Sequence, residues 1–213
     1  MASGKSTLAG RLGPAITDAH PFTVAVVSTD GFLHPNARLA ELGILERKGF
    51  PESYDTDAVH AFLDAVLAGR STTVPVYDHH TYDIVETVSI VEPADVVVLE
   101  GVNALAFRER LDLAIYLHAE EPHLREWFTT RAFALRDAAR TEWSPFFGPW
   151  VDASDEEFRA MTSVAWELVN RPNLVENIEP HRLVADIVIV KAADHTIESV
   201  EIRTSDEEGH GRG

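Results

Sequence analysis

The chain has 213 residues, 45% of them apolar and 25% charged, which is the size and composition of one globular domain with its own core. Its formal net charge of −17 argues against nucleic acid as a partner, because clusters of Lys and Arg bind a phosphate backbone. The sequence has no cysteine, which excludes disulfides and thiolate chemistry, and its apolar runs are shorter than a membrane span. We therefore expect a cytoplasmic protein with no membrane partner.

The first ten residues, MASGKSTLAG, contain GKST, the second half of a phosphate-binding loop. In the full pattern, G-x-x-x-x-G-K-[ST], backbone N–H groups surround the phosphates, the lysine reaches the β- and γ-phosphates, and the hydroxyl binds magnesium. The segment TLAGRL that follows is compatible with a helix, whose N-terminus favours phosphate. We expect Gly4, Lys5, Ser6 and Thr7 to bind ATP and Ser6 to bind Mg²⁺, although a four-residue match also arises by chance.

Four short runs rich in Val and Ile predict strands. They do not alternate between apolar and polar residues, which is typical of strands buried on both faces of a parallel sheet. The runs are residues 22–28, 95–100, 113–118 and 186–191. Three stretches between them have helical features, and these are residues 55–69, 122–139 and 155–170.

Residues that begin or end helices support this division of the chain. Asp55 to Asp57 are candidate N-caps of the first helical stretch and Gly69 is a stop signal, while the acidic residues 155–157 suit the positive end of the third. Strands that alternate with helices predict an α/β layered fold. No repeat or linker interrupts the pattern, so we expect one domain over residues 1–203 and a disordered tail over residues 204–213.

Two carboxylates follow predicted strands, at the end where α/β folds bind ligands. Asp30, in STDGF, could accept a proton from a substrate hydroxyl that attacks ATP. Glu100, in DVVVLEG, has the position of a carboxylate that orients magnesium in a P-loop enzyme. For both residues the alternative is an ordinary turn, Asp-Gly or Glu-Gly, without a catalytic role.

Polar aromatic side chains crowd the segment VPVYDHHTYD, which contains Tyr77, His79, His80 and Tyr82. Pro75 restricts any strand here to the edge of a sheet or to the start of a strand. A pair of histidines without a clear acidic third ligand is a poor zinc site. We therefore expect these side chains to face a substrate from a loop.

A further candidate lies in LREWFTTRAFALR, where Trp127, Arg131 and Leu135 share one face of the predicted helix. From that face Arg131 could bind a transferring phosphate through two parallel hydrogen bonds. The alternative is an arginine that is solvated or paired with a carboxylate, as most helical arginines are.

Taken together, these segments closely resemble bacterial type I pantothenate kinase, a P-loop kinase alongside uridine kinase and phosphoribulokinase. The resemblance covers residues 2–203, and its most specific motif is KGFPESYD at residues 48–55. The other matching segments are STDGFLHPN (28–36), PVYDHHTYD (75–83), VVVLEGVNAL (96–105) and NLVENIEPHRLVADIVIVKAADH (173–195).

The resemblance implies a three-layer P-loop NTPase-type fold with a mostly parallel central sheet, here lacking the strand that precedes the loop. It also implies that ATP and Mg²⁺ are used to phosphorylate pantothenate to 4′-phosphopantothenate, the first step of coenzyme A biosynthesis. Members of the family are cytosolic homodimers that coenzyme A inhibits, so we expect a homodimer and feedback inhibition here as well.

The family's functional residues carry over to matching positions of this chain. The residues that match its loop lysine, loop serine, catalytic aspartate and phosphate-holding arginine are Lys5, Ser6, Asp30 and Arg131. Those that match its pantothenate or coenzyme A pocket are Tyr77, His79 and Asn170, and those near the adenine are Lys191 and His195. Phe128 replaces a tyrosine that contacts substrate, and Ala132 and Leu135 replace aromatic residues, which should widen the pocket.

Departures from the family leave other interpretations open. Family members have a longer N-terminal segment with the first strand and the first loop glycine, so we expect either a start upstream of Met1 or a chain that folds poorly and binds ATP weakly. Gly10 falls where an arginine of the family helps to bind the inhibitor's phosphates. The alternatives to a pantothenate kinase are a remnant that binds pantothenate or coenzyme A without turnover and a P-loop kinase for another small alcohol.

Overall fold

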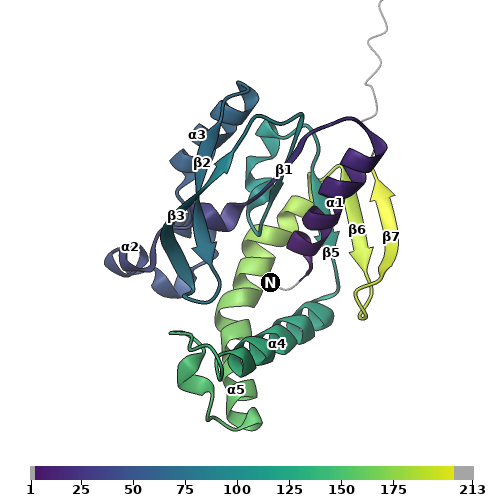
Figure 1. Cartoon of the computed structure of the whole chain (residues 1–213). Coiled ribbons are helices and arrows are strands. Elements are labelled where there is room, and N and C mark those ends of the chain that lie inside the picture. Colours follow the sequence, from purple (N-terminus) through teal and green to yellow (C-terminus); the bar gives the residue numbers. More distant parts are fainter. Residues whose placement is uncertain (1–2, 204–213) are drawn as a thin grey trace, which may run out of the picture.

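The four runs rich in Val and Ile form strands in the computed structural model, which describes residues 3–203 (Figure 1). These strands are β1 (Val24–Ser28), β4 (Val96–Glu100), β5 (Ile115–His118) and β6 (Ile187–Lys191). β1 pairs with β4 and β5 with β6, each in parallel, and β7 (Ile197–Ile202) pairs antiparallel with β6. The predicted α/β fold is therefore confirmed, whereas the predicted tail, residues 204–213, lies outside the described residues, as do residues 1–2.

The predicted helical stretches are helices as well. One begins after Asp55, whose carboxylate accepts a hydrogen bond from Ala58 N at 2.9 Å, and ends before Gly69, whose φ is +64°. Another begins with a capping box between Ser154 and Glu157. The α-helices are α1 (Lys5–Ala19), α2 (Asn36–Glu41), α3 (Thr56–Leu67), α4 (Glu121–Ala138), α5 (Asp155–Ala165) and α6 (Arg171–Asn173). No helix among the described residues is long and apolar enough to cross a membrane.

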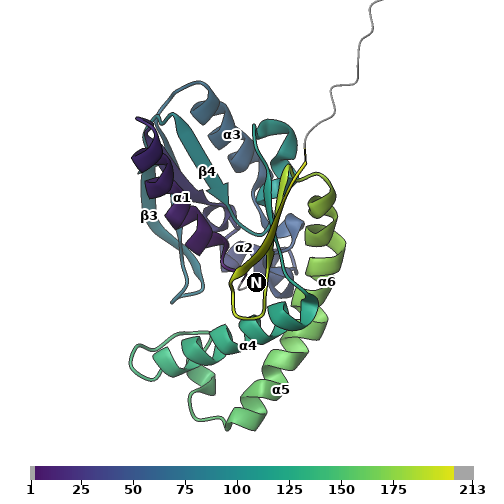
Figure 2. The ribbon, with the colours of Figure 1, turned by 90° about the vertical axis from the view of Figure 1, so that its right-hand side faces the viewer.

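Shorter helical segments connect these elements. After α5 the chain continues in π-helical winding on both sides of α6, so that one long helical rod runs past α4 (Figure 2). The π-helical segments are η6 (Trp166–Asn170) and η7 (Leu174–Ile178). The 3₁₀ helices are η1 (Thr29–Phe32), η2 (Leu45–Arg47), η3 (Pro51–Ser53), η4 (Ala104–Arg110), η5 (Gly148–Trp150) and η8 (Glu179–Leu183). π-helical turns occur frequently at functional sites, and this rod passes the region described below.

The β1–β4 sheet lies between two layers of helices. Successive side chains of a strand point to opposite faces, and Ala25 and Val27 of β1 join the main core, to which α3 contributes Phe62. On the other face, Val24 and Val26 meet α1, where a Cβ on Gly13 would be 3.8 and 3.6 Å from their methyl groups. Figure 2 shows α1 lying along β4. This arrangement is the expected three-layer one.

The prediction that these strands are buried on both faces is wrong for the β1–β4 sheet. Val26 is 46% exposed, and every residue of β4 is half-buried. The physical reason lies in α1, which presents Gly13 to this face and so adds no side chain over Val26. In addition, no strand ladder within the described residues joins β4 to β5, so one edge of β4 has no backbone partner there.

The segment VPVYDHHTYD forms an antiparallel hairpin of β2 (Thr72–Asp78) and β3 (Asp83–Val91) and not simply a loop. Pro75 is tolerated because this sheet has two strands and its register shifts between Pro75 and Val76. Tyr77 therefore lies in a strand, which corrects the predicted loop placement, whereas His79, His80 and Tyr82 lie in the reversal between the strands.

Candidate functional site

The phosphate-loop residues lie at the positive end of α1. Gly4 precedes the helix with φ of +87°, a conformation that favours glycine, and its carbonyl accepts a hydrogen bond from Leu8 N at 2.9 Å. Lys5, Ser6 and Thr7 form the first turn of the helix. The first backbone N–H groups of a helix have no partner within it, and together with the helix dipole they attract phosphate. The helix expected after GKST is thus confirmed.

Ser6 and Glu100, the two predicted magnesium ligands, are in direct contact. Ser6 Oγ donates a hydrogen bond to Glu100 Oε1 at 2.9 Å. Glycine is required next to Glu100, because a Cβ on Gly101 would lie 1.6 Å from Thr29 Oγ1. Hydroxyl and carboxylate oxygens are ligands that Mg²⁺ accepts, so this pair fits the ion. Within the described residues, no cluster of three or more His, Cys, Asp or Glu side chains forms another candidate metal site.

Asp30 lies beside this pair, in the turn η1 that follows β1. Ser28 at the end of β1 is the register partner of Glu100, so Asp30 and Glu100 leave the sheet at the same edge. Burial lowers the pKa of Lys5, the charges of Glu100 and Asp30 raise it, and the charge of Arg131 lowers it. Two carboxylates and two cations, all predicted from the sequence, therefore lie close enough to influence one another.

The β2–β3 hairpin brings aromatic side chains to the same region. The ring of Tyr77 lies 5.1 Å from that of His79 and 6.1 Å from that of Tyr82, measured between centroids. Burial raises the pKa of Tyr77 and Tyr82, and the negative charge of Asp30 contributes to both shifts. The hairpin thus forms one wall of the site, and it carries all four residues of this segment that were predicted to face a substrate, Tyr77, His79, His80 and Tyr82.

Lys48 is a residue of this region for which the sequence predicted no role. It belongs to the KGFPESYD segment, and its Nζ lies 4.8 Å from the ring centroid of Tyr77 and 5.0 Å from that of Tyr82. The same atom donates a hydrogen bond to the carbonyl of Tyr82, which is 34 residues away along the chain. No local pattern indicates a contact over that separation.

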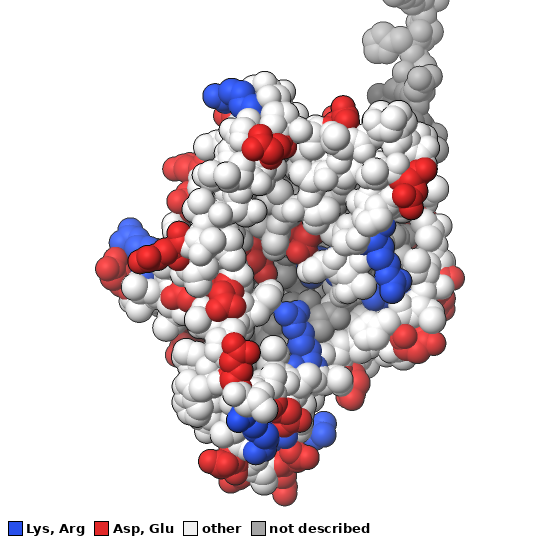
Figure 3. Space-filling view, in the orientation of Figure 1, with Lys and Arg blue, Asp and Glu red and all other residues white. Residues whose placement is uncertain are grey.

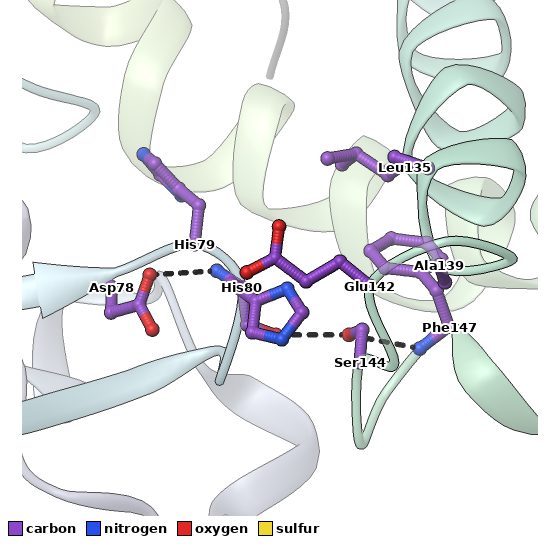
Figure 4. Close-up of a pocket in the computed structure, with 9 residues that line it drawn as sticks. Asp78, His79, His80, Leu135, Ala139, Glu142, Ser144 and Phe147 are labelled. Carbon is purple, nitrogen blue, oxygen red and sulfur yellow. Dashed lines mark hydrogen bonds between the residues drawn. The ribbon is translucent and has the colours of Figure 1, made fainter.

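A cavity of about 320 Å³ opens between the tip of the hairpin and the end of α4 (Figure 4). Ser144 Oγ donates a hydrogen bond to the carbonyl of His80 at 2.9 Å and so links the two sides. Leu135 lines this cavity, whereas Ala132 packs into a core cluster with Phe158 and does not. The residues that line the cavity are Asp78, His79, His80, Leu135, Ala138, Ala139, Glu142, Ser144 and Phe147.

Lys191 and His195 lie beside the phosphate loop, at the end of β6 and in the turn that follows it. Lys191, at the end of β6, donates from Nζ to the carbonyl of Ser3 at 2.8 Å. The ring of His195 stacks on that of Trp127 with a centroid separation of 3.9 Å, and burial, followed by the charge of Lys191, lowers the pKa of this histidine. These residues are next to the loop and give it an aromatic neighbour.

Two predicted substrate residues, Phe128 and Asn170, lie in the helical layer. Phe128 packs against Trp166 with a centroid separation of 5.9 Å, and Asn170 Nδ2 donates to the carbonyl of Ala165 at 3.2 Å within the π-helical segment. Within the described part of the chain, no hydrogen bond or ring contact joins Phe128 or Asn170 to Asp30 or to the hairpin. The structure does not bring them into direct contact with the other candidates.

The surface around these residues combines both signs of charge. Figure 3 shows a hollow in the middle of this face, with acidic and basic side chains at its margin. The chain as a whole carries a formal net charge of −17, so a few aimed cations have to balance any bound phosphate. This charge distribution fits a small anionic ligand better than a polyanion.

Sequence comparisons connect this arrangement with kinases. The family model "Phosphoribulokinase / Uridine kinase family" matches residues 1–122. A pantothenate kinase of Rhodopseudomonas palustris (strain TIE-1) is 40% identical over 219 residues, which cover 95% of this chain and 69% of the relative. A pantothenate kinase of Sorangium cellulosum (strain So ce56) is 42% identical over 216 residues, covering 95% of this chain and 70% of the relative.

Solved structures share the fold at low sequence identity. D-glycerate 3-kinase from Cryptococcus neoformans var. grubii has a TM-score of 0.65 at 13% identity, over 93% of this chain and 86% of its own. A putative fructose transport system kinase from Silicibacter sp. TM1040 has a TM-score of 0.64 at 21% identity, over 85% of this chain and 80% of its own. At these identities the likeness concerns the fold alone.

Proposed function

This chain belongs to the pantothenate kinases, within the Phosphoribulokinase / Uridine kinase family, and from that premise we propose that it phosphorylates pantothenate with ATP. The product is 4′-phosphopantothenate, and the reaction is the first step of coenzyme A biosynthesis. The observation that carries the proposal is the convergence of Asp30, Lys5 and the Ser6–Glu100 pair where β1 and β4 end.

Phosphoryl transfer depends mainly on positioning and on charge stabilisation. Asp30 accepts the proton of the primary hydroxyl of pantothenate as the hydroxyl oxygen attacks the γ-phosphorus. Lys5 and Arg131 hold the oxygens of the transferring phosphoryl group, the bond to the β–γ bridging oxygen breaks, and ADP leaves. The mutual influence of these three charges, which acts on the pKa of Lys5, supports this division of roles.

ATP binds with its phosphates at the N-terminus of α1, where Gly4 and residues 5–7 provide backbone N–H groups. Ser6 and Glu100 would hold Mg²⁺, which would neutralise part of the phosphate charge. Lys191 and His195 contact the adenine, a role that their position next to the loop supports.

Pantothenate lies against the hairpin wall, where Tyr77, His79 and Tyr82 orient its polar groups. Phe128 and Asn170 contribute to the same pocket from the helical layer, an assignment that rests on the resemblance to the family. Inhibition by coenzyme A, assembly as a homodimer, and a cytoplasmic location belong to the same proposal and have the same basis, as does the extent of the domain, residues 1–203.

A coupled assay of ADP release tests the proposed reaction. We expect ADP to form only when ATP, Mg²⁺ and pantothenate are all present, and mass spectrometry to identify the product as 4′-phosphopantothenate. Uridine, D-glycerate and fructose serve as competing acceptors. ADP release with one of these alcohols and not with pantothenate would show a kinase of other specificity. Pantothenate binding without ADP release would show a binding protein that no longer catalyses transfer.

A further inference from the structure

Lysine is rare in this chain, and its positions are informative. The sequence has three lysines among its 18 Lys and Arg residues, namely Lys5, Lys48 and Lys191. Lys5 and Lys191 lie at the phosphate loop, and the proposed mechanism uses both. Lys48 is also half-buried next to the site, but the mechanism gives it no function. Unlike arginine, a lysine can lose its charge near neutral pH when its surroundings are dry.

The ammonium group of Lys48 connects two segments that are distant in the sequence. Nζ donates a hydrogen bond to Asn36 Oδ1 at 2.6 Å and another to the carbonyl of Tyr82 at 2.5 Å. It also faces the rings of Tyr77 and Tyr82, at 4.8 and 5.0 Å from their centroids. A cation at such distances is attracted by the negative face of an aromatic ring. Lys48 therefore contacts both tyrosines of the hairpin wall.

Tyr82 needs such support because its backbone is unusual. Its φ is +60°, a conformation that residues with a side chain adopt rarely and that persists only where the surroundings hold it. Asn36 Nδ2 donates to the same Tyr82 carbonyl at 3.1 Å, and Asn36 N donates to Asp83 Oδ1 at 2.9 Å. Lys48 and Asn36 together thus fix the reversal that orients the Tyr82 ring.

Lys48 is itself held in place through the next residue. Gly49, with φ of +94°, accepts hydrogen bonds at its carbonyl from Asn103 Nδ2 at 3.1 Å and from Asn173 Nδ2 at 2.8 Å. Asn103 follows the end of β4 and Asn173 belongs to α6. The backbone next to Lys48 is therefore anchored to the segment after β4 and to α6, and this fixes the point from which the Lys48 side chain extends.

We infer that Lys48 is a positioning residue for the acceptor: its ammonium keeps the Tyr77 and Tyr82 rings in place beside Asp30, so the acceptor binds tightly only while Lys48 carries its positive charge. This inference rests on the proposed function, which names pantothenate as the acceptor. It goes beyond that function because it assigns acceptor affinity to a residue that need not touch the acceptor.

The charge of Lys48 changes in an accessible pH range. Burial lowers the pKa of Lys48 to about 8, against the opposing effect of Asp83 from β3 and of Asp30 from η1. The other titratable groups that face it are the hydroxyls of Tyr77 and Tyr82, whose pKa burial raises, so they stay neutral between pH 7 and 9. Lys48 is therefore mostly charged at pH 7 and mostly neutral at pH 9.

Calorimetric titration of pantothenate into the whole chain at pH 7 and pH 9 tests the inference without depending on turnover. If the charged form alone is competent, the Kd of the wild type rises about tenfold between these pH values, because the apparent Kd is inversely proportional to the charged fraction of Lys48. Lys48→Met replaces the lysine by an unbranched side chain of similar length without a charge. This variant should raise the Kd about tenfold or more at pH 7 and abolish the pH effect. Lys48→Arg, which stays charged at both pH values, should show no rise at pH 9.

Arg47→Met is the matched control, because Arg47 lies next to Lys48 but pairs with Glu52 and stacks on Phe50 at 3.9 Å. Its Kd should stay within twofold of the wild type at both pH values. The inference is overturned if Lys48→Met binds as the wild type does, or if the rise at pH 9 persists in Lys48→Arg. A wild type that binds no pantothenate at pH 7 overturns the proposed function, and the inference with it.

Discussion

Asp30 lies near two cations on different elements, Lys5 on α1 and Lys48 after η2. Burial lowers the pKa of both lysines, and the negative charge of Asp30 opposes that shift in each. Glu100 acts in this way on Lys5 and Asp83 acts on Lys48, but Asp30 acts on both. In the proposed reaction Lys5 holds the phosphate and Lys48 positions the wall that binds the acceptor. Asp30 is therefore the carboxylate that is near both reactants, which is the position that a general base for the transfer requires.

Asp30→Asn should lower kcat by a factor of about 10² to 10⁴, because the amide cannot accept the proton of the attacking hydroxyl. The Kd of pantothenate, measured by calorimetry, should change little, since the side chain keeps its size. Asp95→Asn is the control. Asp95 lies just before the first residue of β4, at the end of the strand away from Glu100, and accepts hydrogen bonds from Thr23 N and Oγ1. A normal kcat in Asp30→Asn would show that the proton goes elsewhere.

The candidate residues differ in how far they could be predicted from the sequence. Lys5, Ser6 and Glu100 were predictable because each belongs to a short motif, a loop before a helix or the end of an apolar strand. The contact of Lys48 with Tyr82 was not predictable, because it spans 34 residues and depends on a positive φ that the surrounding structure imposes. Local patterns specify the residues of the site, but tertiary contacts specify how the wall is held.

The strands and helices also differ in how far they could be predicted from the sequence. The parallel strands were predictable because their Val and Ile runs have no polar alternation, although β1 and β4 are less buried than that pattern implies, and helices such as α5 because their caps are explicit. β7 escaped prediction because it is an exposed edge strand, with IESVEI in place of an apolar run. The hairpin strand β2 was missed in part because Pro75 restricts a strand to a sheet edge or to the start of a strand, and the polar aromatic segment after it favoured a loop. The π-helical segments were not predictable, since a change from i→i+4 to i→i+5 hydrogen bonding over five residues leaves no clear periodic signature.

Asp186 joins three of these elements at the start of β6. Its Oδ2 accepts a hydrogen bond from Ala114 N at 2.6 Å, just before β5, and its Oδ1 accepts one from Arg108 at 2.8 Å. Asp186→Asn should lower the free energy of unfolding by about 1 to 2 kcal/mol, near the lower end for hydrogen bonds to charged groups because the side chain is 30% exposed.

The pH dependence of this stability difference follows from the pKa of Asp186. The hydrogen bond from Ala114 N lowers this pKa most, and the hydrogen bond and charge of Arg108 lower it as well. A lowered pKa means that the carboxylate stabilises the fold fully above the unfolded pKa, about 3.9, and less as the pH falls towards the folded value. Urea unfolding of wild type and variant should therefore differ at pH 7 and converge below pH 4. Asp18→Asn, at an exposed position near the end of α1, should show neither effect. An equal difference at all pH values would contradict this account.

At the scale of the whole molecule, side chains connect the β1–β4 sheet to the β5–β6–β7 sheet. Within the described residues no strand ladder joins β4 to β5. Instead, Leu105 and Ile178 pack against the buried side chains of the β5–β6–β7 sheet. Lys191 adds a polar link, because its hydrogen bond from the end of β6 to Ser3 spans 188 residues and ends one residue before Gly4. The position of the phosphate loop relative to the second sheet therefore depends on this lysine.

Lys191→Met should raise the KM for ATP about tenfold or more, since losing a hydrogen bond from a charged donor costs about 1.5 to 3 kcal/mol. The KM for pantothenate should change much less, because Lys48, and not Lys191, holds the hairpin wall. Arg203→Met is the control: Arg203 also donates to backbone carbonyls, those of Arg182 and Leu183 at 2.6 and 2.8 Å, but away from the loop. Its KM for ATP should remain that of the wild type. If Lys191→Met and Arg203→Met lose stability equally and both leave the KM for ATP unchanged, then Lys191 only stabilises the fold and does not position the loop.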